Sequence, residues 1–144
     1  MANHNYSSKY FKPQELVPKK VYDTLGAKSY CLFEKKVLQQ LDKLRVDYGK
    51  ALKINDWNNG GNYSESGYRE LYTNTGASKS SHKFGYAFDI KHYDHSSLQP
   101  LREFIIQNAE LYGIKRVENF DETPTWIHLE FTTELVEVTY YFNP

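Results

Sequence analysis

The stretch "SSHKFGYAFDI", residues 80–90, places a histidine and an aspartate seven positions apart in a run of aromatic and polar residues. Between His82 and Asp89 stand two small residues, Gly85 and Ala87. Glycine permits backbone angles that are closed to other residues, so the chain can turn at Gly85. A loop that turns there and enters a strand would bring the imidazole and the carboxylate to a common point, with room left beside Ala87.

The pattern of apolar residues on either side predicts the remaining elements. We expect helices over residues 32–48, closed by Gly49, and from Ser97 to Gly113, with Pro100 in the first turn. Strands are expected at residues 51–55, 86–93, 114–120, 125–131 and 136–142, the last three as a meander. A short turn or helix around residues 13–17 and a loop over 56–67 complete the pattern. The sequence therefore predicts an α+β fold, with a mainly antiparallel sheet packed by helices.

Length and composition narrow the class of protein. The 144 residues suit one domain, residues 1–144, of which residues 1–9 are expected to form a flexible arm. The 18 basic and 18 acidic side chains cancel, so no field favours nucleic acid as a partner. No apolar run reaches the ~20 residues of a membrane span. The first residues lack the layout of a secretory signal, so we expect synthesis in the cytoplasm without a signal peptide. The single cysteine, Cys31, excludes an internal disulfide and a thiolate zinc cage.

A metal site is one interpretation of the histidines. Of five histidines, His82 and His128 lie at or inside predicted strands among aromatic residues. A catalytic zinc takes about three nitrogen or oxygen ligands and keeps one position open, which His82, Asp89 and His128 would satisfy. Manganese or cobalt would fit the same set. A strand histidine is also commonly a hydrogen-bonded core residue, so spacing alone leaves both readings open.

Five positions carry a family resemblance. Ser80, His82, Gly85, Ala87 and Asp89 match the pattern Ser-x-His-x-x-Gly-x-Ala-x-Asp in full. At average residue usage, such a match in a chain this short has a chance probability on the order of 10⁻⁴ or less. The pattern resembles the signature of the M15 family of zinc D,D-peptidases, which includes D-alanyl-D-alanine carboxypeptidases, dipeptidases and phage endolysins.

Further landmarks follow in the order that the family shows, over roughly residues 10 to 131. They are "YFKPQELV" (10–17), "INDWNNGGNYSESGYR" (54–69) and "WIHLEF" (126–131). The resemblance implies a hedgehog/D-Ala-D-Ala-peptidase-like fold and one Zn²⁺ ion held by His82, Asp89 and His128.

The resemblance also implies substrate contacts. Arg69, in "SGYR", matches an arginine that family members use near the scissile bond, and a guanidinium can hold a carboxylate or stabilise an oxyanion. The alternative is a surface arginine paired with Glu65 or Glu70. Three more residues are expected to contact substrate, although each aromatic one is equally well explained by packing: Ser80, Tyr68 and Trp126.

The general base is where the chain departs from the family pattern. Many members carry an acid three residues before the last histidine, but this chain has Thr125 there, and a hydroxyl is no base near neutral pH without a partner. Glu118, at the end of the preceding strand, is the expected base because a hairpin would fold it back toward His128. The other acids near enough in sequence are Asp121, Glu122 and Glu130, of which Glu122 and Glu130 are the main alternatives.

Together these features predict a zinc metallopeptidase that cuts a peptide bond in bacterial cell-wall peptidoglycan. It would be of the D-Ala-D-Ala carboxypeptidase or endopeptidase/endolysin type, monomeric, and without nucleic-acid or membrane partners. It would act on the wall after release from the cell, or be virion-associated. The alternative is a non-catalytic, zinc-stabilised structural or peptide-binding module of a phage particle. Thr125 favours that alternative, whereas Arg69 argues against it.

Overall fold

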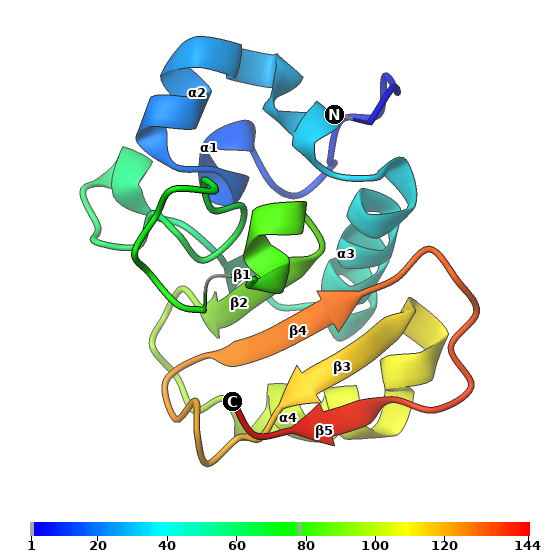
Figure 1. The fold of residues 1–144 in the computed structure, drawn as a ribbon. Coiled ribbons are helices and arrows are strands. Elements are labelled where there is room, and N and C mark those ends of the chain that lie inside the picture. Colours follow the sequence, from blue (N-terminus) through cyan, green and yellow to red (C-terminus); the bar gives the residue numbers. More distant parts are fainter. Residues whose placement is uncertain (1, 78) are drawn as a thin grey trace.

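A single sheet organises the computed structural model, which describes residues 2–77 and 79–144 (Figure 1). Over these residues five strands pair in the order β1-β2-β4-β3-β5. The strands are β1 (Leu52–Lys53), β2 (Ala87–His92), β3 (Ile114–Glu118), β4 (Ile127–Phe131) and β5 (Tyr140–Phe142). The α-helices are α1 (Pro13–Leu16), α2 (Lys19–Leu25), α3 (Lys35–Tyr48) and α4 (Gln99–Asn108). Short 3₁₀ helices are η1 (Gly26–Leu32), η2 (Trp57–Asn59), η3 (Ser81–Phe84) and η4 (Ala109–Tyr112). The α+β class predicted from the sequence is confirmed.

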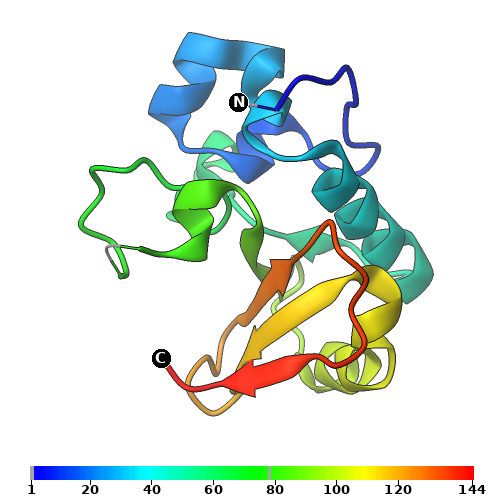
Figure 2. The same ribbon diagram turned by 45° about the vertical axis from the view of Figure 1, so that its right-hand side comes forward.

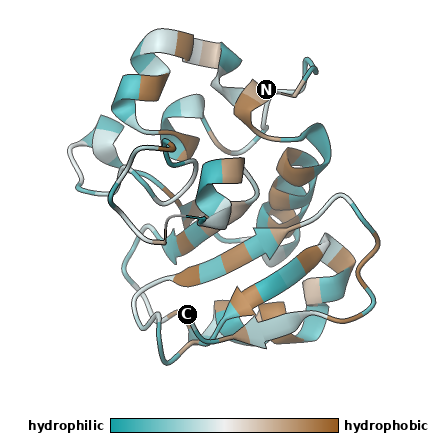
Figure 3. Cartoon of the chain, viewed as in Figure 1, coloured by the Kyte–Doolittle hydropathy of each residue, from teal (hydrophilic) through white to brown (hydrophobic). Residues whose placement is uncertain are grey.

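One face of the sheet forms the hydrophobic core. Successive strand residues point to opposite faces, so Phe88 and Ile90 of β2 share a face with Ile127 and Leu129 of β4. All four side chains are fully buried, in the same cluster as apolar residues of α3 and α4. The alternation is visible as brown and teal bands along the strands in Figure 3. This burial fixes which side chains point to the other face.

The opposite face of the sheet is polar. Asp89 stands directly opposite His128 in the β2–β4 ladder, and Ala87 stands opposite Glu130. In Figure 2, η3 and the loop that follows Arg69 lie on this side of the sheet, and α3 and α4 lie on the other. The predicted strand carrying Asp89 therefore has the alternation that the sequence indicated.

The two predicted helices are present with modified ends. Helix α3 ends at Tyr48, and Gly49 follows in the left-handed region at φ 81°, as expected for a C-terminal glycine. Helix α4 begins after Leu98 rather than Ser97, whose hydroxyl accepts a hydrogen bond from the Gln99 N–H. Helix α2 and η1 were not predicted. Helix α2 has seven residues, and its apolar positions Val21, Tyr22 and Leu25 span only about one turn, so the pattern is too short to predict a helix.

The predicted meander is wrong at β5. Strand β5 pairs with β3 rather than β4, and it runs parallel to β3, with Glu118 opposite Phe142. Both edges of β4 are already occupied, by β2 and by β3. The chain after β4 must therefore cross to the free edge of β3. Three of the four strand pairings are antiparallel, and the sheet is mixed.

The segment predicted to form a flexible arm makes specific contacts with α3, although residue 1 lies outside the described residues. The buried Asp42 carboxylate accepts hydrogen bonds from the Tyr6 hydroxyl (2.5 Å), the Ser8 hydroxyl (2.5 Å) and the Lys9 N–H (2.9 Å). His4 Nε2 lies 2.8 Å from the Phe33 carbonyl oxygen.

None of the helices in the described part of the chain is both long enough and apolar enough to span a bilayer.

Replacing Asp42 with asparagine tests this attachment. The amide keeps one acceptor oxygen and loses the charge, so half-buried donors lose their charged partner, and we expect the unfolding free energy to fall by about 2 kcal/mol. Urea denaturation would measure the change. The matched control is Asp23→Asn, which breaks the exposed Lys19–Asp23 pair and should cost less than about 0.5 kcal/mol. Equal losses in the two variants would contradict the structural role of Asp42.

Candidate metal centre

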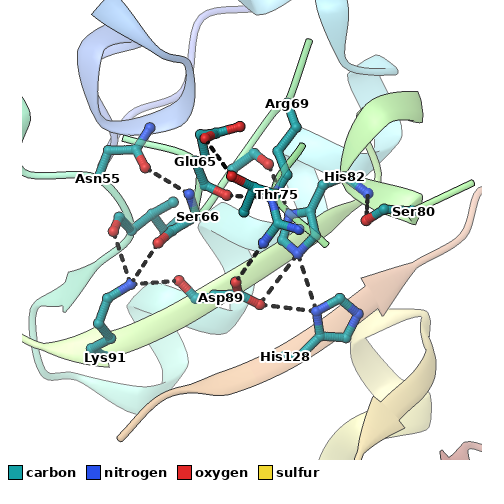
Figure 4. Close-up of polar contacts among 12 residues, drawn as sticks. Asn55, Glu65, Ser66, Arg69, Thr75, Ser80, His82, Asp89, Lys91 and His128 are labelled. Carbon is teal, nitrogen blue, oxygen red and sulfur yellow. Dashed lines mark hydrogen bonds and ion pairs between the residues drawn. The ribbon is translucent and has the colours of Figure 1, made fainter. Parts of the chain in front are cut away.

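Three side chains from three separate elements converge on the polar face of the sheet. They are His82 of η3, Asp89 of β2 and His128 of β4, and all three are buried (Figure 4). His82 Nε2 lies 3.2 Å from His128 Nδ1 and 3.3 Å from Asp89 Oδ1, and the latter two atoms are 2.9 Å apart. The structure thus brings together the three residues that the sequence predicted as metal ligands.

The local chain geometry explains how His82 reaches this point. The Ser80 hydroxyl accepts the His82 N–H at the start of η3, and Gly85 ends η3 at φ 76°. A Cβ on Gly85 would lie 2.2 Å from the Leu32 carbonyl oxygen. Gly85 is therefore required both for its backbone angle and for its lack of a side chain, as the turn predicted there demands.

Hydrogen bonds on the outer side of each imidazole orient the rings. His82 Nδ1 lies 2.8 Å from the Gly67 carbonyl oxygen, which can only accept, so Nε2 is left with its lone pair. His128 Nε2 lies 3.3 Å from Glu130 Oε1, which leaves Nδ1 to face Asp89. Partners of this kind fix the tautomer and ring angle of metal-ligating histidines.

The donor set fits a divalent metal ion. Two imidazole nitrogens and one carboxylate oxygen are ligands that zinc accepts at about 2.0–2.2 Å, and a tetrahedral site of that size separates its ligands by about 3.4 Å. The separations observed between the three donor atoms, 2.9 to 3.3 Å, are close to this value. The same donor set is not specific for zinc.

The charges of the cluster reinforce this fit. Burial opposes ionisation of Asp89, but hydrogen bonds with His128 and His82 hold the pKa of its carboxyl well below the usual range. Burial likewise disfavours a charged His128, yet its bonds to Asp89 and Glu130 raise its pKa to about 9. The buried Asp89 carboxylate is stabilised by positive charge, which the Arg69 guanidinium supplies at Oδ2 and which a protonated imidazole or a metal cation would supply at Oδ1.

Arg69 lies against this cluster rather than on the open surface. Its Nη2 is 3.2 Å from Asp89 Oδ2, and its Nε donates to the Glu65 carbonyl oxygen at 2.7 Å. A Cβ on Gly76 would lie 2.5 Å from Arg69 Nη1, so the loop passes close to the guanidinium. The predicted alternative was a salt bridge with Glu65 or Glu70. In the structure the carboxylate facing Arg69 is that of Asp89.

A cavity of about 350 Å³ opens onto the three predicted ligands. Predicted site residues on its wall are Arg69, Ser80, His82, Asp89, Glu118, Trp126, His128 and Glu130. The structure does not bring Tyr68 to it: the Tyr68 ring packs edge-on against Phe33 and lines a different cavity. Thr125 is exposed and also lines a different cavity.

The candidate bases occupy different environments. Burial raises the pKa of the Glu118 carboxyl; His128 opposes this, and Asp89 and Glu122 add to it. Glu130 accepts hydrogen bonds from the Ser81 hydroxyl at 2.7 Å and from Arg116 at 3.1 Å. Burial opposes ionisation of Glu130, but its bonds to His128 and Ser81 lower its pKa. Glu122 is exposed. Glu118 is thus the acid on the cavity wall with a raised pKa, and Glu130 is engaged in orienting His128.

Sequence reasoning missed several residues of the cavity wall, among them Phe142, Arg116 and Ser81. The Phe142 ring packs edge-on against the His128 ring at a centroid distance of 5.8 Å, and Arg116 lies over Phe142 at 4.1 Å. Phe142 reaches the site because β5 pairs with β3, which the expected meander did not allow. The alternation of β3, which puts Arg116 and Glu118 on one face, was the signal available for Arg116.

Comparisons with models of protein families, with curated proteins and with solved structures found no match. The resemblance to the M15 family therefore remains a prediction that rests on the residues themselves.

Two glycine substitutions test the turn that positions His82. In Gly85→Ala, a methyl group would meet the Leu32 carbonyl oxygen in addition to the left-handed strain, so we expect a loss of at least about 2 kcal/mol in unfolding free energy. Gly60→Ala is the control. It has a similar φ of 85°, with nothing within 4 Å of the added Cβ, and should cost about 1 kcal/mol. Thermal or urea denaturation would compare them, and equal costs would contradict the packing argument.

Proposed function

We propose that this chain is a zinc-dependent peptidase acting on peptides of bacterial cell-wall peptidoglycan, with the hedgehog/D-Ala-D-Ala-peptidase-like arrangement that its motifs imply. The observation that supports this best is the convergence of His82, Asp89 and His128 on one cavity. Arg69 and Glu118 stand on the wall of the same cavity. An arrangement of metal ligands, cation and acid around one hollow suits hydrolysis better than structural support alone.

Each residue has a defined role in the proposed reaction. His82, Asp89 and His128 would hold the ion, which when bound supplies Lewis-acid activation of water and of the scissile carbonyl. Arg69, fixed by Asp89 and the Glu65 carbonyl, would bind the terminal carboxylate of the substrate or the developing oxyanion. Ser80 and Trp126 would contact the peptide from the cavity wall.

Glu118 would be the general base and then the general acid. It would take a proton from the attacking water and deliver it to the amine that leaves when the peptide bond breaks. A carboxyl with a raised pKa suits both steps, because a base must also give its proton back near neutral pH. Glu130 would orient His128 through its Nε2 instead of taking part in proton transfer.

The substrate class rests on the resemblance and on the shape of the site. A cavity of about 350 Å³ holds part of a short peptide rather than a folded protein surface. The proposal covers cleavage of the terminal D-Ala-D-Ala bond, of a cross-bridge, or of another stem-peptide bond as in endolysins. The protein would act as a monomer on the wall after release or from a virion, with no nucleic-acid or membrane partner.

One observation favours a second candidate function. The position at which the resemblance places the acid, Thr125, is exposed and lines a different cavity. A module that has lost its base would keep the metal ligands for stability or for peptide binding. The alternative is therefore a non-catalytic, zinc-stabilised structural or peptide-binding module of a phage particle.

Metal binding is the first test. Isothermal titration of the metal-free protein with zinc should show one site, and His82→Ala or Asp89→Asn should lower its affinity by more than about 100-fold, since even outer partners of ligands cost 10–100-fold. His95→Ala is the control, because His95 is exposed and lies outside the metal cavity. Zinc affinity that is unchanged in Asp89→Asn would exclude this metal site.

Hydrolysis is tested with purified muropeptides. Mass spectrometry should show new products with the zinc-loaded protein and none after metal removal, and the product masses would identify the bond. Glu118→Gln should lower the rate at least about 100-fold while zinc affinity is retained, because only proton transfer is lost. Glu122→Gln, at an exposed position, should keep most of the activity. A protein that binds zinc but leaves all muropeptides intact would favour the non-catalytic module.

A further inference from the structure

A second cavity, of about 440 Å³, lies at the end of β2 beyond Asp89. We call it the Lys91 cavity; its charged wall residues are Lys53 of β1, Lys91 of β2 and Arg102 of α4. No described aspartate or glutamate lines it, and it shares no described wall residue with the metal cavity. The charged side chains of its wall are therefore all positive, and protonation of His92 or His95, which also line the cavity, would add further positive charge.

Two of these three cations lack a carboxylate partner. Lys53 Nζ is 3.2 Å from Asp56 Oδ2 and is paired. In the described part of the chain, no acidic group forms a salt bridge with Lys91 or Arg102 within 4.0 Å. Lys91 is buried and Arg102 is half-buried, and a buried cation without a paired carboxylate is costly, so a bound anion at this place would stabilise the wall.

The hydrogen bonds of Lys91 and Arg102 go to neutral groups. The Lys91 ammonium donates to the carbonyl oxygens of Ile54 and Asp89 and to the Ser66 hydroxyl, at 3.0 to 3.1 Å. Arg102 Nη2 donates to the carbonyl oxygens of Thr123 and Pro124, whereas the buried Arg102 Nε has no hydrogen-bond partner among the described residues. Both side chains are thus held in place by neutral acceptors and by the aromatic rings of Tyr63 and Phe120, without a carboxylate in direct contact.

The start of α4 adds to the positive potential. Ser97 and Leu98, which precede the helix, line the Lys91 cavity; the Ser97 hydroxyl accepts the Gln99 N–H, and Leu98 itself makes no side-chain cap. The N-terminal end of a helix carries partial positive charge and favours anions. This contribution comes from the backbone and is independent of the lysine and arginine side chains.

We propose that the Lys91 cavity is a binding site for a small oxyanion, either a carboxylate or a phosphate group. The Arg102 guanidinium, whose Nε has no partner among the described residues, would donate to such a group, and Lys91, whose three N–H groups are already used, would contribute its positive charge. The site is separate from the metal centre and does not depend on the proposed peptidase activity. The anion would come either from an acidic peptide, as a side-chain or terminal carboxylate, or from free phosphate.

Titrations followed by nuclear magnetic resonance test the site and its source. Inorganic phosphate and N-acetylglutamate are added in separate arms at constant ionic strength, with chloride as the control. Saturable shifts of the amides of His95, Ser97 and Leu98 are expected in at least one arm. Tighter binding of N-acetylglutamate would indicate a peptide carboxylate, and tighter binding of phosphate a free phosphate. No saturable shift at these amides with either anion would overturn the proposal.

Variants separate a specific site from general charge attraction. Arg102→Gln should weaken binding about tenfold, the value of one charge-assisted hydrogen bond, whereas Arg102→Lys keeps the charge and should weaken it less. Lys115→Gln removes an equal charge from an exposed position outside the Lys91 cavity and should leave affinity within about twofold. Equal weakening in Arg102→Gln and Lys115→Gln would overturn the proposal.

Arg102→Gln could also disturb the turn at Thr123 and Pro124, whose carbonyl oxygens Arg102 binds. A further variant therefore tests the site without changing Arg102. Ser97→Glu introduces a carboxylate at an exposed position on the cavity wall without removing any described contact of Arg102. The new charge should compete with the anion and weaken binding about tenfold. Unchanged affinity in a folded Ser97→Glu protein would also overturn the proposal.

Discussion

The register between β2 and β4 is the constraint on which the candidate site depends. It places Asp89 opposite His128, and a slip of one strand by one residue would turn its polar side chain toward the core and separate the two. The register is fixed from the other face, where Phe88, Ile90 and Leu129 are fully buried. Burying those side chains is what holds the polar ones in position, so the geometry of the candidate metal ligands follows from the packing of the core.

Charge pairing on the polar face supplies the second level of order. Asp89 meets two imidazoles on one oxygen and Arg69 on the other. Glu130 likewise divides its oxygens, with Ser81 and His128 on one and Arg116 on the other. Because each buried carboxylate has partners on both oxygens, neither can rotate without losing a charge-assisted bond. The imidazoles are therefore held by partners that are themselves fixed.

The sequence predicted those features that local chemistry determines. Gly49 predicted a helix end and Gly85 a turn, and the alternation around Asp89 predicted a strand with one buried face. Prediction from the sequence failed where the outcome depends on competition between distant segments. The residues of segment 136–142 contain no information that both edges of β4 are occupied. The partner of β5 could therefore not be predicted from that segment's own sequence. Tyr68 follows the same rule, since its packing against Phe33 depends on where the segment between η1 and α3 lies relative to the loop.

The surroundings of the candidate site, which depend on distant segments, also bear on whether the site is catalytic. A structural zinc site is closed by four protein ligands, whereas a catalytic site keeps a position open toward solvent or substrate. In the described residues, the group able to hold a metal has three members, and they stand on the wall of a cavity. Glu118 stands on that wall in an environment that raises its pKa, whereas Glu130 is fully engaged with His128, Ser81 and Arg116. Sequence alone ranks these acids only by proximity along the chain; their surroundings distinguish a group free to exchange a proton from one that holds a ligand in place. That distinction is the physical argument for an enzyme, and it does not require the acid to occupy the position of Thr125.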